Sequence, residues 1–324
     1  MYTFEECQEV INKALNNIDL KEDPINLFTP IEYILSIGGK RIRPAMVLMT
    51  CNVFSDSIED SINAALAIEI FHNFTLLHDD IMDNAEIRRG RQTVHEKWNA
   101  NTAILSGDAM CILAYDILLK SKSELKDIIL PIFNHAAFDT CKGQQLDIDF
   151  ENRNKVSIKE YIEMISLKTS SLLAASMKIG ALAGTASETD AQYFYEFGKN
   201  IGISFQLQDD LLDAFGDEKA FGKKNGGDIV ANKKTFLLIK ALELAQGEDY
   251  KILTNIISSQ GLDPEEKISL VLEIYEKLNI KQITQEQINF YFNEAMTHIN
   301  KIEINSAKIE PILAFTNNLM NRKS

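Results

Sequence analysis

The sequence predicts an all-α protein that folds as a single domain. Apolar residues recur at spacings of three and four along the 324 residues, which is the period of an amphipathic helix. Only six prolines are present, and none lies between Pro44 and Pro131 or between Pro131 and Pro264, so long helices are permitted. No alternating run of apolar and polar residues is long enough to predict a strand. We therefore expect residues 1–324 to form one large helical bundle, with its sites built from facing helices.

Each element in the first half of the chain follows from a local pattern. Residues 3–18 and 24–36 are amphipathic at helical spacing, and a basic turn at residues 38–44 leads into the next helix. Residues 59–83 form one long helical pattern that ends in an acidic cluster, and residues 86–95 form a basic loop. The helices expected in this half are 3–18, 24–36, 44–53, 59–83, 101–120, 124–151 and 157–184.

The second half is also helical, apart from one loop. Capping patterns that begin at Ser157 and Ser187 introduce two helices, the second of which ends in another acidic cluster. A polar loop rich in glycine and lysine covers residues 216–234, and Asp263 is a predicted N-cap before Pro264 at a first helical position. The later helices are expected at 234–245, 248–259, 264–279, 284–300 and 305–321.

The composition excludes several classes of function. Hydrophobic residues make up 45% of the chain, and the net charge of −14 argues against a nucleic-acid or anionic-membrane partner. Four cysteines without C-x-x-C spacing are typical of reduced core thiols rather than of a zinc site. The N-terminus lacks a basic and apolar leader, and no uninterrupted apolar run approaches the ~20 residues that span a bilayer. We expect a cytoplasmic protein without a membrane span.

Two acidic clusters of identical spacing end two strongly apolar helical runs. The first is D-D-I-M-D at residues 79–83, and the second is D-D-L-L-D at residues 209–213, which begins 130 residues later (209 − 79 = 130). Positions i and i+4 share one face of a helix, so each cluster presents a pair of carboxylates. Such pairs are costly to bury without a cation, which predicts a hard divalent ion such as Mg²⁺ completed by phosphate oxygens. The candidate metal ligands are Asp79, Asp80, Asp83, Asp209, Asp210 and Asp213.

Three clusters of basic residues accompany the acidic ones. They are Lys40, Arg41 and Arg43 in a turn that begins with glycines, then Arg88, Arg89 and Arg91, and finally Lys223, Lys224, Lys233 and Lys234. Arginine binds phosphate through two parallel hydrogen bonds, lysine binds it as a point charge, and the free amides at the start of a helix also attract it. Salt bridges to the nearby aspartates are the alternative, and they would explain one such cluster better than they explain three.

Taken together, these motifs resemble the trans-isoprenyl diphosphate synthase (polyprenyl synthetase) family over about residues 35–237. The resemblance rests on Gly38-Gly39-Lys40-Arg41-Ile42-Arg43-Pro44, His72, Leu76 to Asp83, Arg88-Arg89-Gly90, Gly107-Asp108, Gly143-Gln144-Gln145-Leu146-Asp147, Lys168-Thr169, Phe205 to Asp213, Gly222-Lys223, and Gly226-Gly227-Asp228 through Lys233-Lys234-Thr235. It implies an isoprenoid synthase-like all-α fold, usually a homodimer. The implied reaction joins isopentenyl diphosphate head-to-tail to an allylic diphosphate of C5–C15.

The resemblance also implies roles for individual residues. Asp79 and Asp83 would bind two Mg²⁺ ions and Asp209 a third, with the other three aspartates acting mainly through water and Mn²⁺ as an alternative metal. The allylic diphosphate would be held by Arg88, Lys168, Lys223 and Lys233, and isopentenyl diphosphate by Lys40, Arg43, His72 and Arg89. Gln144 and Asp147 would line the metal side of the cavity. The carbocation would be stabilised by Gln206 and by the Lys168 and Thr169 carbonyls on a distorted helix. Without the resemblance, His72 would be interpreted as a core histidine.

Aromatic residues before the first acidic cluster predict the length of the product. On a helix Phe74 lies about 7–8 Å and Phe71 about 12 Å from Asp79 along the axis, so either can act as a floor for the growing chain. A large aromatic at Phe74 with a small residue at Thr75, and no insertion in the cluster, resembles geranylgeranyl-type members. We therefore predict a short all-trans product, C20 ahead of C15.

Three alternatives remain open at this point. A farnesyl or a medium- or long-chain synthase would share the same motifs. A class I terpene cyclase usually replaces the second aspartate cluster and does not need the Gly-Gly-Lys turn, and a silent partner subunit usually loses an aspartate motif. This chain keeps both aspartate motifs and the Gly-Gly-Lys turn. It departs from the family at Gln92, where many members have proline, and its last residues, 321–324, could help to close the site.

Overall fold

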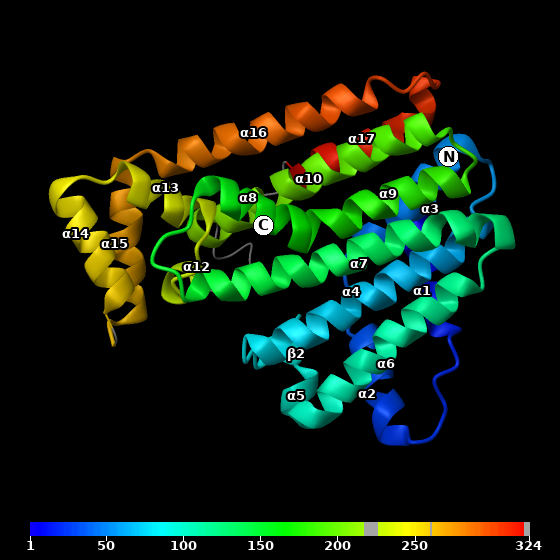
Figure 1. The fold of residues 1–324 in the computed structure, drawn as a ribbon, viewed down its shortest axis with the longest axis horizontal. Coiled ribbons are helices and arrows are strands. Elements are labelled where there is room, and N and C mark those ends of the chain that lie inside the picture. The colour runs from blue at the N-terminus through cyan, green and yellow to red at the C-terminus, as the bar shows by residue number, and fades with distance from the viewer. Residues whose placement is uncertain (217–225, 260, 321–324) are drawn as a thin grey trace. The chain divides into compact units, whose positions relative to one another are not determined.

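The computed structural model describes residues 1–216, 226–259 and 261–320, and helices dominate this part of the chain (Figure 1). The predicted all-α fold class is therefore confirmed. The elements up to α7 are α1 (Phe4–Asn16), α2 (Ile25–Ser36), α3 (Ile42–Phe54), the 3-10 turn η1 (Glu59–Ser61), α4 (Ile62–Met82), β1 (Ile87–Arg88), β2 (Arg91–Gln92), α5 (Val94–Lys97), α6 (Ala100–Leu119) and α7 (Ser123–Glu151). The later elements are α8 (Ile158–Ile165), the π-helix η2 (Ser166–Ser170), α9 (Ser171–Ala183), α10 (Glu188–Phe215), α12 (Gly227–Val230), α13 (Phe236–Leu244), α14 (Gly247–Ser258), α15 (Pro264–Lys277), α16 (Ile280–Ile299) and α17 (Ser306–Met320).

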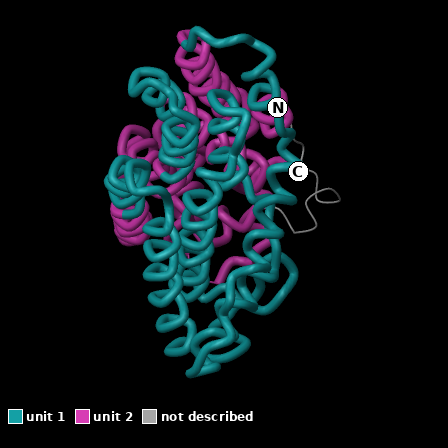
Figure 2. The backbone as a smooth tube through the Cα atoms, turned by 90° about the vertical axis from the view of Figure 1, so that its right-hand side faces the viewer, with its two compact units in different colours: residues 1–137, 172–195, 302–313 teal, residues 138–171, 196–301, 314–324 magenta. Residues whose placement is uncertain are grey.

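The chain divides into two compact units, which are coloured separately in Figure 2. The first unit comprises residues 1–137, 172–195 and 302–313. Within it α4 packs along α6 and also contacts α1, α2 and α3. Every residue from Pro44 to Val53 in α3 and from Ala64 to Phe71 in α4 is buried. Helices buried all round need an apolar sequence on every face, which explains the long apolar run before the first acidic cluster.

The second unit comprises residues 138–171, 196–301 and 314–324. Within it α13 contacts α8, α15 and α16, and α12 packs on α15. Its core includes large buried side chains from several of these helices, among them Phe150, Tyr161, Leu207, Leu253 and Tyr275. The prediction of a single domain over residues 1–324 stays a prediction.

Three local features differ from the sequence-based expectation. The basic loop after α4 contains an antiparallel hairpin in which Ile87 pairs with Gln92 and Arg88 with Arg91. The helix expected at 157–184 is interrupted by the π-helix η2, as the resemblance implied for its distorted part. The loop expected at 216–234 includes the short helix α12. Strands of two residues are too short to show an alternating pattern, which is why the hairpin was not predicted.

One helix is long and apolar enough, by length and composition, to cross a membrane. It is α6, and 39% of its apolar window is buried inside the structure. Core helices of globular proteins pass the same test, and α6 also carries Ser106, Asp108 and Asp116. The prediction of a chain without a membrane span is therefore kept as a proposal.

Candidate active site

The first aspartate motif lies at the C-terminal end of α4. Asp79 is half-buried and Asp83 is exposed, and the Asp83 amide donates a 2.8 Å hydrogen bond to the Asp79 carbonyl in the last turn. The last turn of α4 has no basic residue, and the C-terminal end of a helix dipole disfavours carboxylates. The carboxylates of the motif therefore destabilise this end of α4 unless a cation lies near them.

Asp80 differs from its two neighbours in the motif. Its side chain is buried, at 2% exposure, and the Arg88 Nε donates to its two carboxylate oxygens at 2.7 and 2.8 Å. Arg88 Nη2 also lies 2.7 Å from Asp80 Oδ1. The salt-bridge alternative for the basic clusters therefore holds for Arg88 in this structure. The ion pair also fixes the guanidinium beside the aspartate motif.

The hairpin after α4 brings Arg89 to the glycine turn before α3. Arg89 and Gly90 form its two-residue turn, both with positive φ (51° and 75°), which is the conformation that a tight hairpin requires. Arg89 Nη1 donates to the Gly38 carbonyl. A Cβ on Gly39 would lie only 2.6 Å from the Arg89 guanidinium, so a larger residue would displace the guanidinium from this position. Gly38 and Gly39, which belong to the motif shared with the family, thus form the surface against which Arg89 of the second basic cluster packs.

The predicted isopentenyl-diphosphate residues gather around His72. Arg43 Nη1 lies 3.2 Å from His72 Nε2, and burial together with Arg43, Arg89 and other arginines lowers the pKa of His72 well below its usual range. His72 is therefore neutral at pH 7. Arg41 has a different role, because its Nη1 forms a buried 2.5 Å ion pair with Glu69 in α4. Lys40 is exposed in the same turn.

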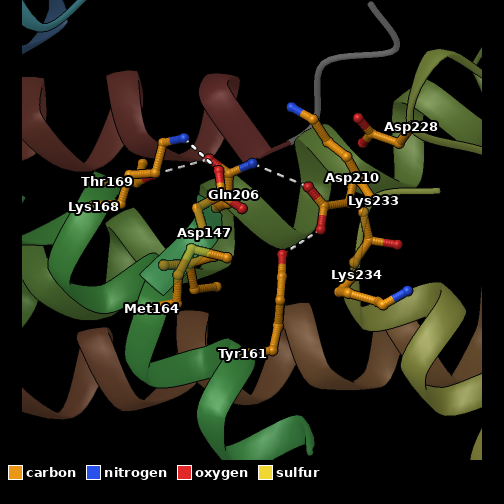
Figure 3. A pocket seen from close by; sticks show the side chains of 12 residues that line it. Asp147, Tyr161, Met164, Lys168, Thr169, Gln206, Asp210, Asp228, Lys233 and Lys234 are labelled. Carbon is orange, nitrogen blue, oxygen red and sulfur yellow. Dashed lines mark hydrogen bonds and ion pairs between the residues drawn. The ribbon is translucent and has the colours of Figure 1, made fainter. Parts of the chain in front are cut away.

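In the second unit, a chain of hydrogen bonds connects η2 to the second aspartate motif (Figure 3). Thr169 Oγ1 donates to Gln206 Oε1 at 3.1 Å, and Gln206 Nε2 donates to Asp210 Oδ1 at 3.0 Å. The Tyr161 hydroxyl donates to the other Asp210 oxygen, Oδ2. Asp210 is 6% exposed, whereas Asp209 and Asp213 are half-buried. The middle aspartate of this motif is therefore also engaged by protein side chains.

The same pocket contains an ion pair and further charged groups. Lys168 Nζ lies 2.6 Å from Asp147 Oδ2, which joins η2 to α7. The pocket is lined by Asp147, Tyr161, Met164, Ile165, Lys168, Thr169, Gln206, Asp210, Asp228, Lys233, Lys234 and Thr235. The structure thus brings six of the predicted site residues in this unit to one pocket, namely Asp147, Lys168, Thr169, Gln206, Asp210 and Lys233. Gln144 is half-buried on α7, and Lys223 and Lys224 lie outside the described residues.

Two glycines allow neighbouring helices to approach η2 closely. A Cβ on Gly143 in α7 would lie 2.2 Å from the Lys168 backbone nitrogen, and one on Gly202 in α10 would lie 2.7 Å from Ser170 Cα. Both contacts are shorter than any real Cβ contact, so the backbone of η2 lies against these positions. Gly143 stands beside Gln144 in one of the motifs, but its role in helix packing was not predicted from the sequence.

Two carboxyl groups of this pocket, Asp210 and Asp228, have raised pKa values because they are buried and lie near other carboxylates. Burial and then the charge of Asp228 raise the pKa of Asp210 to about 7, while hydrogen bonds from Tyr161 and Gln206 oppose the increase. Burial and then Asp213 raise the pKa of Asp228 to about 6. Burial is the larger cause of both shifts, the neighbouring carboxylates add to it, and the charge of Lys233 opposes it.

Asp213 and Asp228 are joined through the short helix α12. The Asp228 amide donates to Asp213 Oδ2 at 2.9 Å, and the Gly226 amide donates to the Asp213 carbonyl at 2.7 Å. At the other end of α12, the buried Lys267 Nζ donates to the Val230 carbonyl at 2.8 Å. These contacts fix α12, and with it Asp228, beside the second motif.

The predicted chain-length residues lie on one side of α4. The Phe74 ring packs 5.3 Å from the Phe71 ring and 4.7 Å from the His78 ring, and Phe71 packs 5.5 Å from Phe133 of α7. Phe71 is buried, whereas Phe74 is only half-buried. Thr75 is also half-buried, and its Oγ1 donates to the His72 carbonyl at 2.8 Å.

Sequence reasoning missed Tyr161 and Asp228 as site residues. Tyr161 precedes Lys168 by seven positions, a spacing that returns to the same helix face, but a tyrosine in an apolar pattern resembles an ordinary core residue. Asp228 lies in the Gly226-Gly227-Asp228 motif, which was noticed without a role for the aspartate.

The donor set suits a hard divalent cation, although neither motif makes a complete site by itself. Among residues 1–216, 226–259 and 261–320, no group of three or more His, Cys, Asp and Glu side chains is placed to hold a metal. The available donors are carboxylate oxygens, which Mg²⁺ prefers, and Mg²⁺ commonly takes one or two of them with water and phosphate oxygens. The two motifs belong to different units, and each meets this requirement within its own unit.

Comparison with known proteins identifies the family. Residues 25–275 match the polyprenyl synthetase family model. The chain is 42% identical over 235 residues to geranylgeranyl diphosphate synthase of Methanosarcina mazei, covering 72% of each chain. It is 34% identical to geranylgeranyl diphosphate synthase of Sulfolobus acidocaldarius, over 94% of this chain and 92% of that protein. A crystal structure of a geranylgeranyl pyrophosphate synthase superposes with a TM-score of 0.94 at 39% identity, covering all of both chains. The chain is therefore a prenyltransferase of the polyprenyl synthetase family.

Proposed function

We propose that this chain condenses isopentenyl diphosphate head-to-tail with an allylic diphosphate of C5–C15 to give an all-trans C20 diphosphate, with C15 as the lesser alternative. The observation that carries the proposal is that the two aspartate motifs have the same arrangement of buried and accessible carboxylates. In each motif the middle carboxylate is buried and engaged by protein side chains, while the outer two are more accessible near a helix C-terminus. The similarity to geranylgeranyl diphosphate synthases supports the C20 product.

The diphosphate of the isopentenyl substrate would bind to Lys40, Arg43, His72 and Arg89. The contact between Arg43 and His72 and the seating of Arg89 on the glycine turn support this assignment. A neutral His72 can donate a hydrogen bond to phosphate and accept one from Arg43, depending on its tautomer. Arg41, which is paired with Glu69, would hold the turn rather than the substrate.

The allylic diphosphate would bind through divalent metal. Members of this family bind diphosphate through divalent metal, and for this chain we propose three Mg²⁺ ions, with Mn²⁺ as an alternative. Asp79 and Asp83 would hold two ions and Asp209 the third, with Asp80, Asp210 and Asp213 in support. When bound, the metal supplies positive charge to the departing diphosphate. Arg88, Lys168, Lys223 and Lys233 would add further positive charge from the protein, and Gln144 and Asp147 would line the same side.

The reaction would then proceed through charge separation that the protein stabilises. The allylic carbon–oxygen bond breaks, and the electron pair leaves with the diphosphate, which the basic side chains neutralise. Gln206 Oε1 and the carbonyls of Lys168 and Thr169 face the resulting carbocation with negative dipole ends. The double bond of isopentenyl diphosphate attacks the cation, and the released diphosphate accepts the proton that is lost. A π-helix displaces backbone carbonyls from regular helical bonding, which supports this role for η2.

The product would stop growing at the aromatic side chains beneath the first motif. Phe74 is half-buried and rests on the buried Phe71, which in turn packs on Phe133. The growing prenyl chain would therefore contact Phe74 first, next to Thr75, and Phe71 would block it at a greater depth. This arrangement supports a C20 product rather than a long chain.

The functional form would be a cytoplasmic homodimer. Its support is a stripe of exposed apolar residues on α6, namely Leu105 at 61%, Ile112 at 72% and Leu119 at 48% exposure. These residues are seven apart and so lie along one face of the helix. A second copy of the chain that covered this α6 stripe would remove the large side chains from water. It would also account for the apolar composition of α6 without a membrane.

Diphosphate release distinguishes this function from its alternatives. The purified protein is expected to release diphosphate only when Mg²⁺, isopentenyl diphosphate and an allylic diphosphate are all present. A terpene cyclase would release diphosphate from the allylic substrate without isopentenyl diphosphate. A silent partner subunit would release none with any allylic primer.

A further inference from the structure

The hydrogen bonds around Asp210 connect a buried tyrosine to the proposed carbocation-facing amide. We infer that Tyr161, acting through Asp210, is a positioning residue for the Gln206 carboxamide. The inference rests on the proposed role of Gln206 and assigns Tyr161 and Asp210 to the orientation of its carboxamide. Its geometric basis is the series Thr169 to Gln206 to Asp210, with Tyr161 on the far oxygen of Asp210 (Figure 3).

The orientation of Gln206 decides whether it helps or hinders the reaction. A carboxamide has an oxygen that accepts and an NH₂ group that donates, and the two ends have nearly the same shape. Only the oxygen carries the negative end of the dipole that a carbocation requires. An amide turned by 180° would present its positive end to the same carbon. A fixed neighbour must therefore hold the amide in one orientation.

Asp210 is the neighbour that can impose this orientation. Its carboxylate oxygens accept hydrogen bonds, so Oδ1 selects the NH₂ end of Gln206 at 3.0 Å and leaves Oε1 toward Thr169. Thr169 cannot impose the orientation alone, because a hydroxyl can either donate or accept. The hydrogen bond to Asp210 thus determines which way the Gln206 carboxamide oxygen points.

Tyr161 in turn holds Asp210. The Tyr161 side chain is 2% exposed within the apolar core of the second unit, where an unbonded hydroxyl would be costly. Its hydroxyl donates to Asp210 Oδ2, so both carboxylate oxygens of Asp210 are used by protein donors. Tyr161 comes from α8 and Asp210 from α10, so the bond also fixes the spacing of these helices at the pocket.

The first motif uses its middle aspartate differently. Asp80 receives the charged guanidinium of Arg88, whereas Asp210 receives a neutral hydroxyl and a neutral amide. The two neutral donors fix the directions of the Asp210 oxygens. This difference favours a positioning role for Asp210 over a purely electrostatic one.

The experiment is a double-mutant cycle between Tyr161→Phe and Gln206→Ala. Single-turnover condensation rates, both KM values and the Mg²⁺ concentration for half-maximal rate are measured for each variant. Tyr161→Phe is expected to lower the rate about tenfold, with KM values and Mg²⁺ dependence within about twofold of the parent. The double variant is expected to match Gln206→Ala within about twofold, because both changes remove the same oriented amide.

The matched control is Tyr275→Phe, which removes another buried phenol hydroxyl from the same core. Tyr275 is also 2% exposed, and among the described residues no hydrogen bond joins it to Asp210. Its parent-like rate would show that loss of a core hydroxyl is not enough to slow condensation. Equal slowing by Tyr275→Phe would instead overturn the inference.

Two further results would overturn the inference. A double variant about tenfold slower than Gln206→Ala would show that Tyr161 acts independently of the amide. A tenfold rise in the Mg²⁺ requirement of Tyr161→Phe would assign Tyr161 to the metal rather than to Gln206. Full activity of Gln206→Ala alone would instead contradict the proposed role of Gln206, so the two failures are distinguishable.

If Tyr161→Phe does not fold, Asp210→Asn and Asp210→Leu decide the matter. Asparagine can accept from Gln206 with its oxygen and donate to Tyr161 Oη with its NH₂ group, so the rate is expected within about tenfold of the parent. Asp210→Leu removes both contacts and is expected to be as slow as Gln206→Ala. Equal losses in both Asp210 variants, with a raised Mg²⁺ requirement, would show that the charge rather than the orientation is needed.

Discussion

Asp80 and Asp210 hold the same place in two motifs of identical spacing, but their surroundings give them different chemistry. Asp80 is paired with Arg88, whereas Asp210 lies near Asp228 and accepts hydrogen bonds from the neutral Tyr161 and Gln206 side chains. Burial and then the charge of Asp228 raise the pKa of Asp210 to about 7, and burial and then Asp213 raise the pKa of Asp228 to about 6. Residue type and spacing alone do not distinguish the two aspartates.

These raised pKa values predict how the metal-free protein responds to pH. A carboxyl whose folded pKa lies above its ordinary value of 3.8 stabilises the fold below that value, and this contribution is lost as pH rises through about 6–7. Asp210→Asn removes the charge, so in EDTA its Tm should exceed that of the parent by roughly 2–4 °C at pH 8 but by less at pH 5. Scanning calorimetry at the two pH values measures the difference. Asp127→Asn, at an exposed position on α7, is the control, and a Tm difference for Asp210→Asn that does not grow with pH would contradict the account.

Phe74 provides a second prediction at the scale of a single residue. Phe74→Ala removes the first aromatic floor and exposes Phe71, about 4–5 Å further along the helix axis. This distance is close to the length of one isoprene unit, so the product should lengthen beyond C20 by about one unit. Chromatography of the dephosphorylated products measures the change. Phe290→Ala, at an exposed phenylalanine on α16, should leave the product length unchanged, and an unchanged distribution for Phe74→Ala would refute the role of Phe74.

At the scale of elements, the π-helix η2 depends on the helices that pack against it. It carries Lys168 and Thr169, and Gly143 and Gly202 let α7 and α10 approach its backbone. A π-turn is uncommon and frequently found at functional sites, and here its place is set by close packing on two sides. The geometry of the pocket therefore depends on two residues that have no side chain.

Gly143→Ala tests this dependence. In an exposed helix the change would stabilise the protein by about 0.5–1 kcal/mol, because glycine is a poor helix former. Here the new Cβ overlaps the Lys168 backbone, so we expect a lower Tm and at least a tenfold loss of condensation rate. Cys141→Ala, an exposed change two residues earlier in α7, should alter neither quantity. A Gly143→Ala variant with a raised Tm and full rate would show that η2 can move without consequence.

Much of this fold and part of the site could be predicted from the sequence, because their signals are local. Helical periodicity predicted almost every helix, and the two aspartate motifs and the basic turn marked the site. Salt bridges between the basic clusters and the aspartates were only an alternative in the sequence, and the choice of Arg88 and Asp80 depends on the path of a hairpin too short to have its own pattern. Tyr161 was missed because its partner, Asp210, is 49 residues away, and only the fold brings them together.

At the scale of the whole molecule, the exposed α6 stripe is the feature that a single chain does not explain. Leu105, Ile112 and Leu119 present large apolar side chains along one face of α6, although the helix packs on α4 and α2 with its other faces. An apolar stripe of this length is typical of a surface covered by another chain. The proposed homodimer covers it with a second copy.

Charged substitutions in the α6 stripe test the homodimer. The double variant Leu105→Asp, Ile112→Asp places two carboxylates where apolar contact is expected, so the dimer should dissociate. Light scattering coupled to size exclusion should then report about half the mass of the parent. Ile25→Asp, which changes an equally exposed residue on α2, is the control and should remain dimeric. A parent chain that is monomeric at micromolar concentration would contradict the proposal.

The most direct test of the account is the length of the product. The enzyme is incubated with Mg²⁺, labelled isopentenyl diphosphate and, in separate reactions, C5, C10 and C15 allylic diphosphates, and the dephosphorylated products are sized by chromatography. We expect elongation that ends at an all-trans C20 alcohol, with C15 as the lesser product. Products of C30 or longer, or a cyclised hydrocarbon formed without isopentenyl diphosphate, would contradict the account.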